Sequence, residues 1–556
     1  MWQSGVCFSG MAQTKNTNAL PSRRARREML TAVLRGLRSI ARAGSAALLA
    51  SSPAVGASPS DCAHLARLHL PGALVLDAEP IPAGRIRAAD FEGHPAVPAF
   101  CRVVGSARPS RDSDIRFEVW LPQADWNGRL WGVGNGNFAG SINDRALGNR
   151  VYAGYAAVAT DTGHETDSMD TYWANGHPEK VVDFGYRGVH EAIVNARRIV
   201  AAYYNHAASR AYFGSCSDGG REALMEAQRY PADYDGIIAG APALDWTRLM
   251  IGGAELDFRW MTNPAHHIPA GKLPAIQSAV RAACPGINED VVDDPAKCQF
   301  DPAVLTCTGA ETDRCLTAAQ VQTLRLLYTG RIPTSDHRFP GFAPGAEVGL
   351  DENYFRSGPG PSDVFRFANG FFKDFVFEDP AWDFNTYDPA RDARLADRKL
   401  GVVLNATNPD LSAFAARGGK LILYHGWNDS TVPPWLTIEY FEQVRATMGE
   451  AKTRAAVRLF MAPGMEHCEG GPGPSFFGAI PDGKAEAETN LSSALQRWVE
   501  EGVAPERIIA TKRRDDKNPN SEVIRSRPLC AWPLAAHYRG QGSADTASSF
   551  DCGPQP

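Results

Sequence analysis

The chain has 556 residues, of which 44% are hydrophobic and 22% charged, and its formal net charge is -6. These values are typical of soluble folded proteins and argue against a disordered or membrane-embedded chain. The length favours two or three domains, or one large domain with an insertion. The mild charge, with no clustered basic face after residue 30, argues against a nucleic-acid-binding protein.

The first 57 residues have the pattern of an export leader. Basic residues within 21–30 precede a short apolar stretch that ends in small residues, and we expect cleavage after Ala57. A basic tail and a true start at Met29 are alternatives, and the export route stays open because the arginine pairs lack the apolar residues of a twin-arginine signal. No later stretch reaches the roughly 20 apolar residues of a membrane span. The sequence therefore predicts a periplasmic or secreted protein.

The cysteines agree with export. Removal of the leader would remove Cys7 and leave ten cysteines of the eleven. An even number suits a disulfide framework in an oxidising compartment. Zinc is the weaker alternative, because the sequence contains no CxxC pair.

The first half of the chain predicts a parallel sheet covered by helices. Strand-like runs alternate with glycine turns in 115–122, 128–140 and 151–164. Apolar residues then recur every three to four positions in 186–206, which predicts a helix. A short strand at 209–215 leads into a helix at 219–231 that Pro231 ends. We assign residues 58–245 to the first part of an α/β core.

The same alternation returns late in the chain, so residues 419–556 are predicted to complete the core. Strands are expected in 418–429 and 455–468, and helices in 435–448 and in 488–502, where Gly502 is the expected stop. Residues 246–418 lose the pattern and are interpreted as an inserted lid domain. Thirteen aromatic residues lie between Phe339 and Tyr387. They form either the core of this lid or a pocket for flat rings.

Ser217 is the candidate nucleophile. It follows a predicted strand and precedes a helix, and such an elbow requires small residues two positions before and after, here Ser215 and Gly219. Ser215 is a poorer candidate, because Phe213 occupies its own flanking position. A serine needs a histidine base oriented by a carboxylate, and in this architecture the acid and then the base follow later strands. Asp429 and His467 stand in those places.

The oxyanion of the tetrahedral intermediate also needs hydrogen-bond donors. One is expected to be the N–H of Asp218, the residue after the nucleophile. The second should come from the glycine-rich loop 132–140, where Gly136 is preferred and Asn135 and Asn137 are next. A dinucleotide-binding interpretation of this loop is rejected because the glycine spacing is wrong and no helix clearly follows.

Cys216 precedes the candidate nucleophile and Cys468 follows the candidate base. If Ser217 and His467 meet in space, these cysteines are forced close together, so the sequence predicts a disulfide between them. Such a bond would fix the two loops of the site relative to each other. The alternative, a free Cys216 acting as the nucleophile, is disfavoured in an exported chain with a partner cysteine available.

The combination of "CSDGGR", "HGWND" and "EHC" resembles the tannase and feruloyl esterase family of α/β-hydrolases, which includes a mono(2-hydroxyethyl) terephthalate hydrolase. Further similar stretches are "ATDTGH", "YPADYDGIIAGAPA", "AGKLPAIQSAV" and "RPLCAWP", so the resemblance spans about Cys62 to Cys552. It implies an α/β-hydrolase fold with a large inserted lid. It also implies a serine carboxylic ester hydrolase that acts on small esters of aromatic, phenolic acids and needs no cofactor for its chemistry.

The resemblance further implies how the other cysteines pair: Cys62 with Cys101, Cys284 with Cys298, Cys307 with Cys315, and Cys530 with Cys552. Lids of this family usually bind a structural calcium through a run of aspartates. Here that run is shorter and contains a proline, but it offers Glu289, Asp290 and Asp293 as oxygen ligands. A calcium site and a solvated acidic turn are both open interpretations.

Three alternative functions remain. An acyltransferase would use the same triad but exclude water from the acyl-enzyme, and a terephthalate-monoester hydrolase would differ in its acid pocket. A non-catalytic binding protein would be expected to lose a member of the triad, and here all three are present. The particular ester and the oligomeric state are not predicted, because lid loops determine the pocket and one fold serves many functions.

Overall fold

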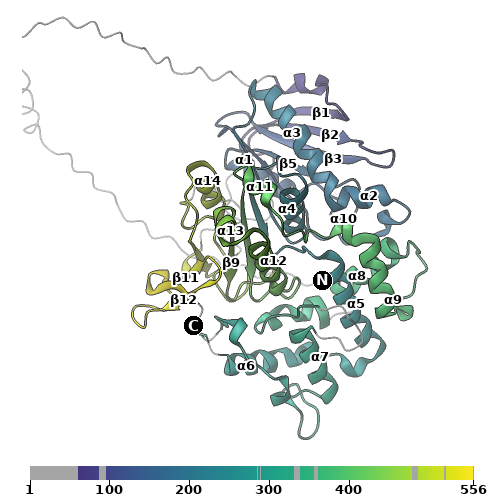
Figure 1. Cartoon of the computed structure of the whole chain (residues 1–556), viewed down its shortest axis with the longest axis vertical. Helices are drawn as coiled ribbons and strands as arrows, with labels where there is room; N and C mark the ends of the chain where they lie inside the picture. Colours follow the sequence, from purple (N-terminus) through teal and green to yellow (C-terminus); the bar gives the residue numbers. More distant parts are fainter. Residues whose placement is uncertain are drawn as a thin grey trace, which may run out of the picture. The chain divides into compact units, whose positions relative to one another are not determined.

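The computed structural model describes residues 61–86, 96–284, 286–288, 290–330, 339–355, 361–478, 486–516, 518 and 521–554. The chain divides into two units, 1–56 and 57–556, and the following concerns the second (Figure 1). The predicted leader lies outside the described residues. Within the described part of the chain, no helix is long and apolar enough to cross a membrane.

A nine-stranded mixed sheet forms the centre of this unit, in the order β1-β2-β3-β5-β4-β6-β7-β8-β9. The first four strands in this order pair antiparallel, and the pairs from β5/β4 to β8/β9 are parallel. The strands are β1 (Ala73–Ile81), β2 (Phe100–Ala107), β3 (Ile115–Pro122), β4 (Arg129–Gly132), β5 (Ala156–Thr160), β6 (Arg210–Cys216), β7 (Gly236–Gly240), β8 (Lys420–Gly426) and β9 (Val457–Ala462).

The register aligns the carboxyl ends of the parallel strands. Cys216 of β6 lies opposite Gly240 of β7, and Gly240 lies opposite Tyr424 of β8. Tyr424 is in turn opposite Phe460 of β9. The loops that follow β6, β8 and β9 therefore emerge at one edge of the sheet, where ligands of open α/β sheets bind.

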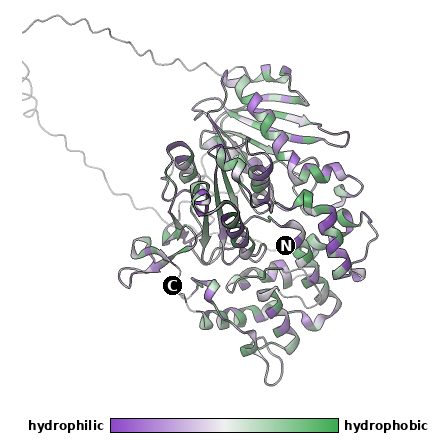
Figure 2. Cartoon of the chain, in the orientation of Figure 1, coloured by the Kyte–Doolittle hydropathy of each residue, from purple (hydrophilic) through white to green (hydrophobic). Residues whose placement is uncertain are grey.

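Helices cover both faces of the sheet (Figures 1 and 2). One face packs against α3 (Gly188–Tyr204), α4 (Asp218–Arg229) and α12 (Pro434–Met448). The other packs against α1 (Asp144–Tyr152) and α14 (Leu491–Glu501). The shorter helices α2 (Pro178–Val182) and α13 (Glu450–Ala456) connect these elements. The helices bury their apolar sides against the sheet, so a hydrophobic core lies on each face.

The predicted helices at 186–206, 219–231, 435–448 and 488–502 correspond to α3, α4, α12 and α14. Gly502 ends α14 with φ of 75°, a left-handed conformation that favours glycine. The expectation that no helix follows the glycine-rich loop is wrong, because α1 begins at Asp144. Its start is fixed by Asn143, whose side chain accepts a hydrogen bond from the N–H of Ala146.

Between β7 and β8 the chain forms a helical region, residues 241–419. Its hydrophobic core also includes Phe138, Trp173 and Phe184 from the first part of the chain. In Figure 1, α5 to α9 gather below the sheet. The helices are α5 (Trp246–Thr262), α6 (Leu273–Ala283), α7 (Ala318–Thr329), α8 (Asp363–Gly370), α9 (Pro389–Ala396), α10 (Val402–Leu404) and α11 (Ser412–Ala416). Most of the aromatic cluster belongs to this core, with Phe342, Phe355 and Phe371 at most 1% exposed.

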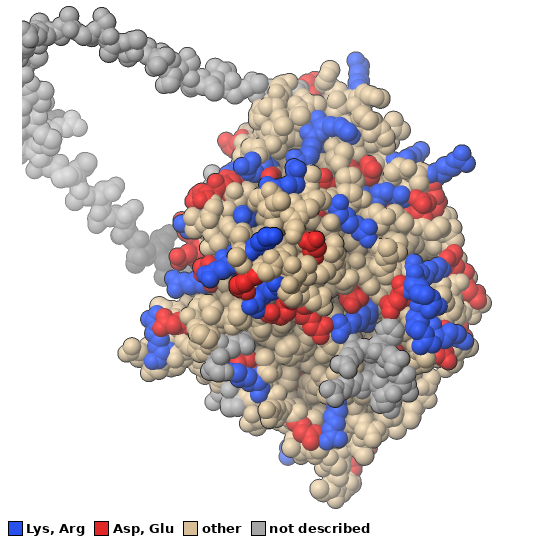
Figure 3. Space-filling view, viewed as in Figure 1, with Lys and Arg blue, Asp and Glu red and all other residues tan. Residues whose placement is uncertain are grey.

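Two small antiparallel sheets complete the C-terminal part. One pairs β10 (Arg507–Arg513) with β11 (Val523–Cys530), and the other pairs β12 (Leu534–Tyr538) with β13 (Phe550–Pro554). The N–H of Trp532 donates to the carbonyl of Leu459, which joins this part to β9. On the face shown in Figure 3, acidic and basic side chains are both widely spread.

Candidate active site

Ser217 lies at a sharp turn between β6 and α4. Its φ of 65° and ψ of -124° are strained for a residue with a side chain. The turn needs the glycines that follow it. A Cβ on Gly219 would lie 2.1 Å from Oγ of Ser215, and a Cβ on Gly220 would lie 2.4 Å from the carbonyl oxygen of Gly240. The sequence "SDGG" thus allows the helix to start directly against the neighbouring strand.

The structure brings Ser217, His467 and Asp429 together in one hydrogen-bonded chain. Nε2 of His467 is 2.9 Å from Oγ of Ser217, and Nδ1 is 2.7 Å from Oδ2 of Asp429. An ionised carboxylate has no hydrogen to donate, so Nδ1 must be the donor in this contact. Nε2 then has no hydrogen and can accept from the serine hydroxyl. This tautomer is the one that a general base requires.

Asp429 is fully buried, and four donors surround its carboxylate. Oδ1 accepts from the N–H groups of Thr431 and Val432, both at 2.8 Å. Oδ2 accepts from His467 and, at 3.0 Å, from a second histidine, His425. Although burial alone would raise the pKa of Asp429, the two histidines hold that pKa well below its usual range. The carboxylate is therefore ionised beside His467.

A disulfide joins the residues that flank the serine and the histidine. Cys216 and Cys468 are bonded, with 5.9 Å between their Cα atoms, and are separated by 252 positions in the sequence. The other four disulfides are Cys62–Cys101, Cys284–Cys298, Cys307–Cys315 and Cys530–Cys552. These are the same five pairs that the sequence analysis anticipated, and they use all ten cysteines among the described residues.

The loop after β4 passes close to the elbow. The N–H groups of Gly136 and Asp218 make no hydrogen bond with another described residue, whereas the N–H of Asn135 is used by Glu222. A Cβ on Gly136 would meet nothing within 4 Å, so open space adjoins it. His164 supports the loop from behind, because its Nε2 lies 2.9 Å from the carbonyl oxygen of Phe138. Burial lowers the pKa of His164 to about 3, so it donates as a neutral ring.

Sequence reasoning missed two buried titratable residues, Arg221 and Glu222, that hold this loop and the elbow. Glu222 of α4 accepts from the backbone N–H and the side-chain amide of Asn135 at 2.9 and 3.1 Å. Arg221 bonds Asp218 at 2.6 Å and the carbonyl oxygen of Gly185 at 2.6 Å. Their position in the sequence could have indicated this role, because both fall within the first five residues of a helix that is buried almost throughout.

We expect the free energy of unfolding to decrease less steeply with rising pH in Glu222→Gln than in the unmodified protein. Burial, and secondarily Asp218, raises the pKa of Glu222 to about 8. The folded state then retains a proton that the unfolded state loses above its ordinary pKa of 4.5, so this group's contribution to stability declines as pH rises towards 8. The slope should change by up to about 1.4 kcal/mol per pH unit.

Urea unfolding of both proteins at pH 5, 6, 7 and 8 measures this slope. Burial also raises the pKa of Asp161 to about 7, so part of the pH dependence should remain in the variant. Identical slopes for the two proteins would contradict the protonated state assigned to Glu222.

A mainly apolar pocket adjoins Ser217. Asp218 is the one charged residue among the described residues that line it, and its carboxylate pairs with Arg221. The helical region supplies most of the walls, so this region covers the carboxyl ends of the strands near the serine. The other lining residues are Asn137, Ala243, Trp246, Leu249, Met250, Gly253, Tyr354, Val364, Phe367, Ala368, Thr431 and Val432.

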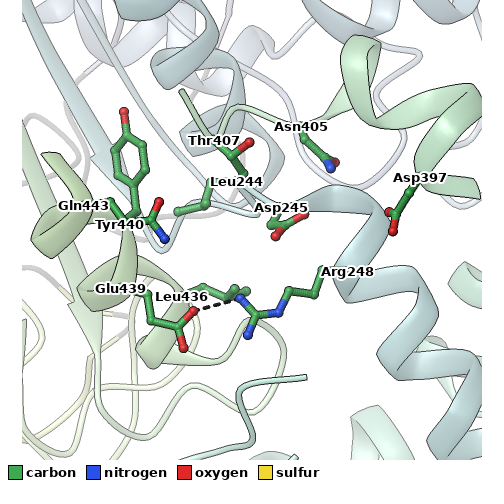
Figure 4. Close-up of a pocket in the computed structure, with 10 residues that line it drawn as sticks. All are labelled: Leu244, Asp245, Arg248, Asp397, Asn405, Thr407, Leu436, Glu439, Tyr440 and Gln443. Carbon is green, nitrogen blue, oxygen red and sulfur yellow. Dashed lines mark hydrogen bonds and ion pairs between the residues drawn. The ribbon is translucent and has the colours of Figure 1, made fainter. Parts of the chain in front are cut away.

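A larger, polar cavity of about 460 Å³ lies elsewhere, between α5, α12 and the segment around Asn405 (Figure 4). An ion pair of 2.8 Å between Arg248 and Glu439 crosses it. Its ten lining residues include neither Ser217, His467 nor Asp429. Size alone therefore does not locate the site, because Ser217 lines the smaller apolar pocket instead.

The predicted calcium site is not supported. Glu289 lies outside the described residues. Asp290 pairs with Arg525 at 3.1 Å, and Asp293 accepts a hydrogen bond from the N–H of Ile287. Among the described residues, no three histidines, cysteines or acids gather as a metal site requires. The local acidic charge is balanced by an arginine from β11, a partner 235 positions away that sequence spacing does not reveal.

These features define the class of protein: an α/β-hydrolase with a serine, histidine and aspartate at the carboxyl edge of its sheet. Residues 101–553 match the family model described as "Tannase and feruloyl esterase". The chain therefore belongs to the tannase and feruloyl esterase family and is a carboxylic ester hydrolase.

Individual relatives agree with this assignment. The chain is 41% identical to "Uncharacterized esterase XCC2094" of Xanthomonas campestris, over 94% of this chain and 96% of that protein. It is 30% identical to "Probable feruloyl esterase B-2" of Aspergillus terreus, over 81% and 86%. The crystal structure of feruloyl esterase B from Aspergillus oryzae is similar with a TM-score of 0.79 and 28% identity, covering 88% of this chain and 99% of that one.

A more distant structure shows the same fold. The tannin acyl hydrolase from Aspergillus niger has a TM-score of 0.69 at 22% identity, and the match covers 87% of this chain and 92% of that one. Together with the observed sheet, these structures confirm the α/β-hydrolase fold with a large helical insertion.

Proposed function

We propose that this protein is an exported serine esterase that hydrolyses esters of aromatic acids through an acyl-enzyme. The observation that carries the proposal is the chain of hydrogen bonds from Ser217 to His467 at 2.9 Å and from His467 to Asp429 at 2.7 Å. It provides a nucleophile, a base and an orienting carboxylate in the order that acyl transfer needs.

In the proposed mechanism, Oγ of Ser217 attacks the ester carbonyl while Nε2 of His467 takes the hydroxyl proton. The resulting oxyanion accepts hydrogen bonds from the N–H groups of Asp218 and Gly136, which have no other partner among the described residues. His467 then gives the proton to the departing alcohol. Water, deprotonated by the same nitrogen, then attacks the acyl-serine. The bond between the acyl carbon and Oγ breaks, Nε2 returns the proton to Oγ, and the acid and the free serine are released. No cofactor enters these steps.

The lining of the pocket suits an uncharged aromatic acyl group. Trp246, Phe367 and Val364 present apolar surface next to Ser217, which suits a flat ring. The free carboxylate of a terephthalate monoester would need a cationic partner when buried, and none of the described residues that line the pocket is an arginine or lysine. This argues for cinnamate-type esters such as ferulates and against terephthalate monoesters.

Export is supported by the five disulfides, since such bonds persist in oxidising compartments. The proposed location is the periplasm or the outside of the cell, with the leader within residues 1–57. The proposed domains are a core of residues 58–245 and 419–556 and a lid of residues 246–418.

We expect methyl ferulate and chlorogenate to be better substrates than mono(2-hydroxyethyl) terephthalate by at least about tenfold in kcat/KM, because each unpaired buried charge costs several kcal/mol. Methyl gallate should fall between them, because its three hydroxyls find few polar partners in the pocket. Initial rates measured side by side on these four esters test the assignment. A preference for the terephthalate monoester would contradict it.

A further inference from the structure

The histidine at position 425 contacts the same carboxylate oxygen as His467. It belongs to β8 and is fully buried. Its Nε2 lies 3.0 Å from Oδ2 of Asp429 and 2.9 Å from the carbonyl oxygen of Val432. Its Nδ1 lies 2.7 Å from Oγ1 of Thr437, a fully buried residue of α12. The ring is thus held between the acid loop and a neighbouring helix.

The neighbours of Nε2 determine where its hydrogen lies. A backbone carbonyl and an ionised carboxylate can only accept, so Nε2 is a donor shared by Val432 and Asp429. On the other side, the hydroxyl of Thr437 donates to Nδ1. Contacts at both nitrogens fix the ring plane as well as the tautomer.

Each oxygen of Asp429 has a distinct set of donors. The N–H groups of Thr431 and Val432 hold Oδ1 within the loop, and His425 alone ties Oδ2 to the sheet. Without this hydrogen bond, His467 would be the remaining donor to Oδ2. The position of Oδ2, and with it the orientation of the His467 ring, would then be less constrained. We infer that His425, held by Thr437, is a positioning residue that keeps Oδ2 of Asp429 aligned with Nδ1 of His467. The inference rests on the proposed triad.

Loss of the Nε2–H donor also has an electrostatic consequence. Among the described residues, the titratable groups His467, His425 and Tyr354, the last from the helical region, interact with Asp429. Removal of one donor raises the pKa of Asp429 and concentrates its negative charge on the contact with His467. We therefore expect the acid limb of kcat/KM to move to higher pH in a variant that lacks this donor.

The test compares His425→Phe, which removes both ring nitrogens, with His425→Gln, whose amide can donate in place of Nε2. We expect His425→Phe to lower kcat at least about tenfold while KM changes less than about twofold, because a lost hydrogen bond to a charged group misaligns only the reacting groups. His425→Gln should restore part of kcat. The acid limb should shift to higher pH in His425→Phe and less in His425→Gln.

Thr437→Val provides an independent variant that leaves His425 in place. It should lower kcat by a smaller factor with KM unchanged. The matched control is Thr453→Val in α13, a buried helix threonine whose hydroxyl donates to the carbonyl of Gly449. In that control, kcat per folded molecule and the pH profile should be those of the unmodified protein. If His425→Phe does not fold, His425→Gln and Thr437→Val still decide the question.

Two results would overturn the inference: wild-type kcat and acid limb in folded His425 variants, or a loss in Thr437→Val no larger than in Thr453→Val. A failure of the triad itself is distinguishable, because it would appear as activity retained in Ser217→Ala whatever the His425 variants do.

Discussion

Replacement of Ser217 by alanine is expected to lower kcat on a chromogenic aromatic ester on the order of 10⁶-fold, as for other serine hydrolases whose triad acts as a unit. The variant keeps the fold, because the strained turn depends on Gly219 and Gly220 and not on the hydroxyl of Ser217. Steady-state rates and the melting temperature, measured on the same preparation, test both statements.

Ser215→Ala is the matched control for this prediction. Ser215 lies two positions away and its Oγ faces Gly219. His467 contacts Ser217, with Nε2 and Oγ 2.9 Å apart. Ser215→Ala should retain most of the activity. Full activity in Ser217→Ala together with its loss in Ser215→Ala would show that the wrong serine had been assigned.

Removal of the disulfide beside the site, in Cys216→Ala/Cys468→Ala, is expected to lower both stability and kcat. The bond spans 252 positions, for which the chain-entropy model gives about 5 kcal/mol. It also joins the neighbours of Ser217 and His467, and a misplacement of 1 Å between reacting groups can cost up to about 100-fold. We therefore expect kcat to fall about 10- to 100-fold at a temperature where the variant is folded.

The pair Cys530→Ala/Cys552→Ala separates stability from positioning. This bond spans 22 positions at the C-terminal sheets and is worth about 3 kcal/mol in the same model. Its removal should lower the melting temperature but leave kcat unchanged. Denaturation curves and kcat for both pairs provide the comparison, and wild-type kcat in Cys216→Ala/Cys468→Ala would exclude the positioning role.

The strands and helices of the α/β core were predictable because they depend on short-range sequence patterns. Helices such as α3 and α4 show apolar periodicity, and Ser217 stands between a strand and a glycine pair that only a tight elbow requires. By contrast, α1 has a glycine at position 148 and few apolar residues, so its amphipathic signal is weak. The edge strand β1 contains Pro80, which lowers its strand signal.

The residues that support the site could not be predicted in the same way. Glu222 meets Asn135 across 87 positions and Arg525 meets Asp290 across 235, and no short-range pattern reports such contacts. His425 stands inside an apolar strand, where its contact with Asp429 depends on how the following loop turns back. The pocket likewise depends on the packing of α5 and α8, which determines which aromatic side chains face Ser217.

The most direct test of the proposed mechanism is labelling with a fluorophosphonate, which reacts with an activated serine, followed by peptide mass spectrometry. We expect one adduct, on Ser217, with esterase activity lost in proportion to labelling and no labelling in His467→Ala. An adduct on Ser215, or full activity in protein that is fully labelled on Ser217, would contradict it.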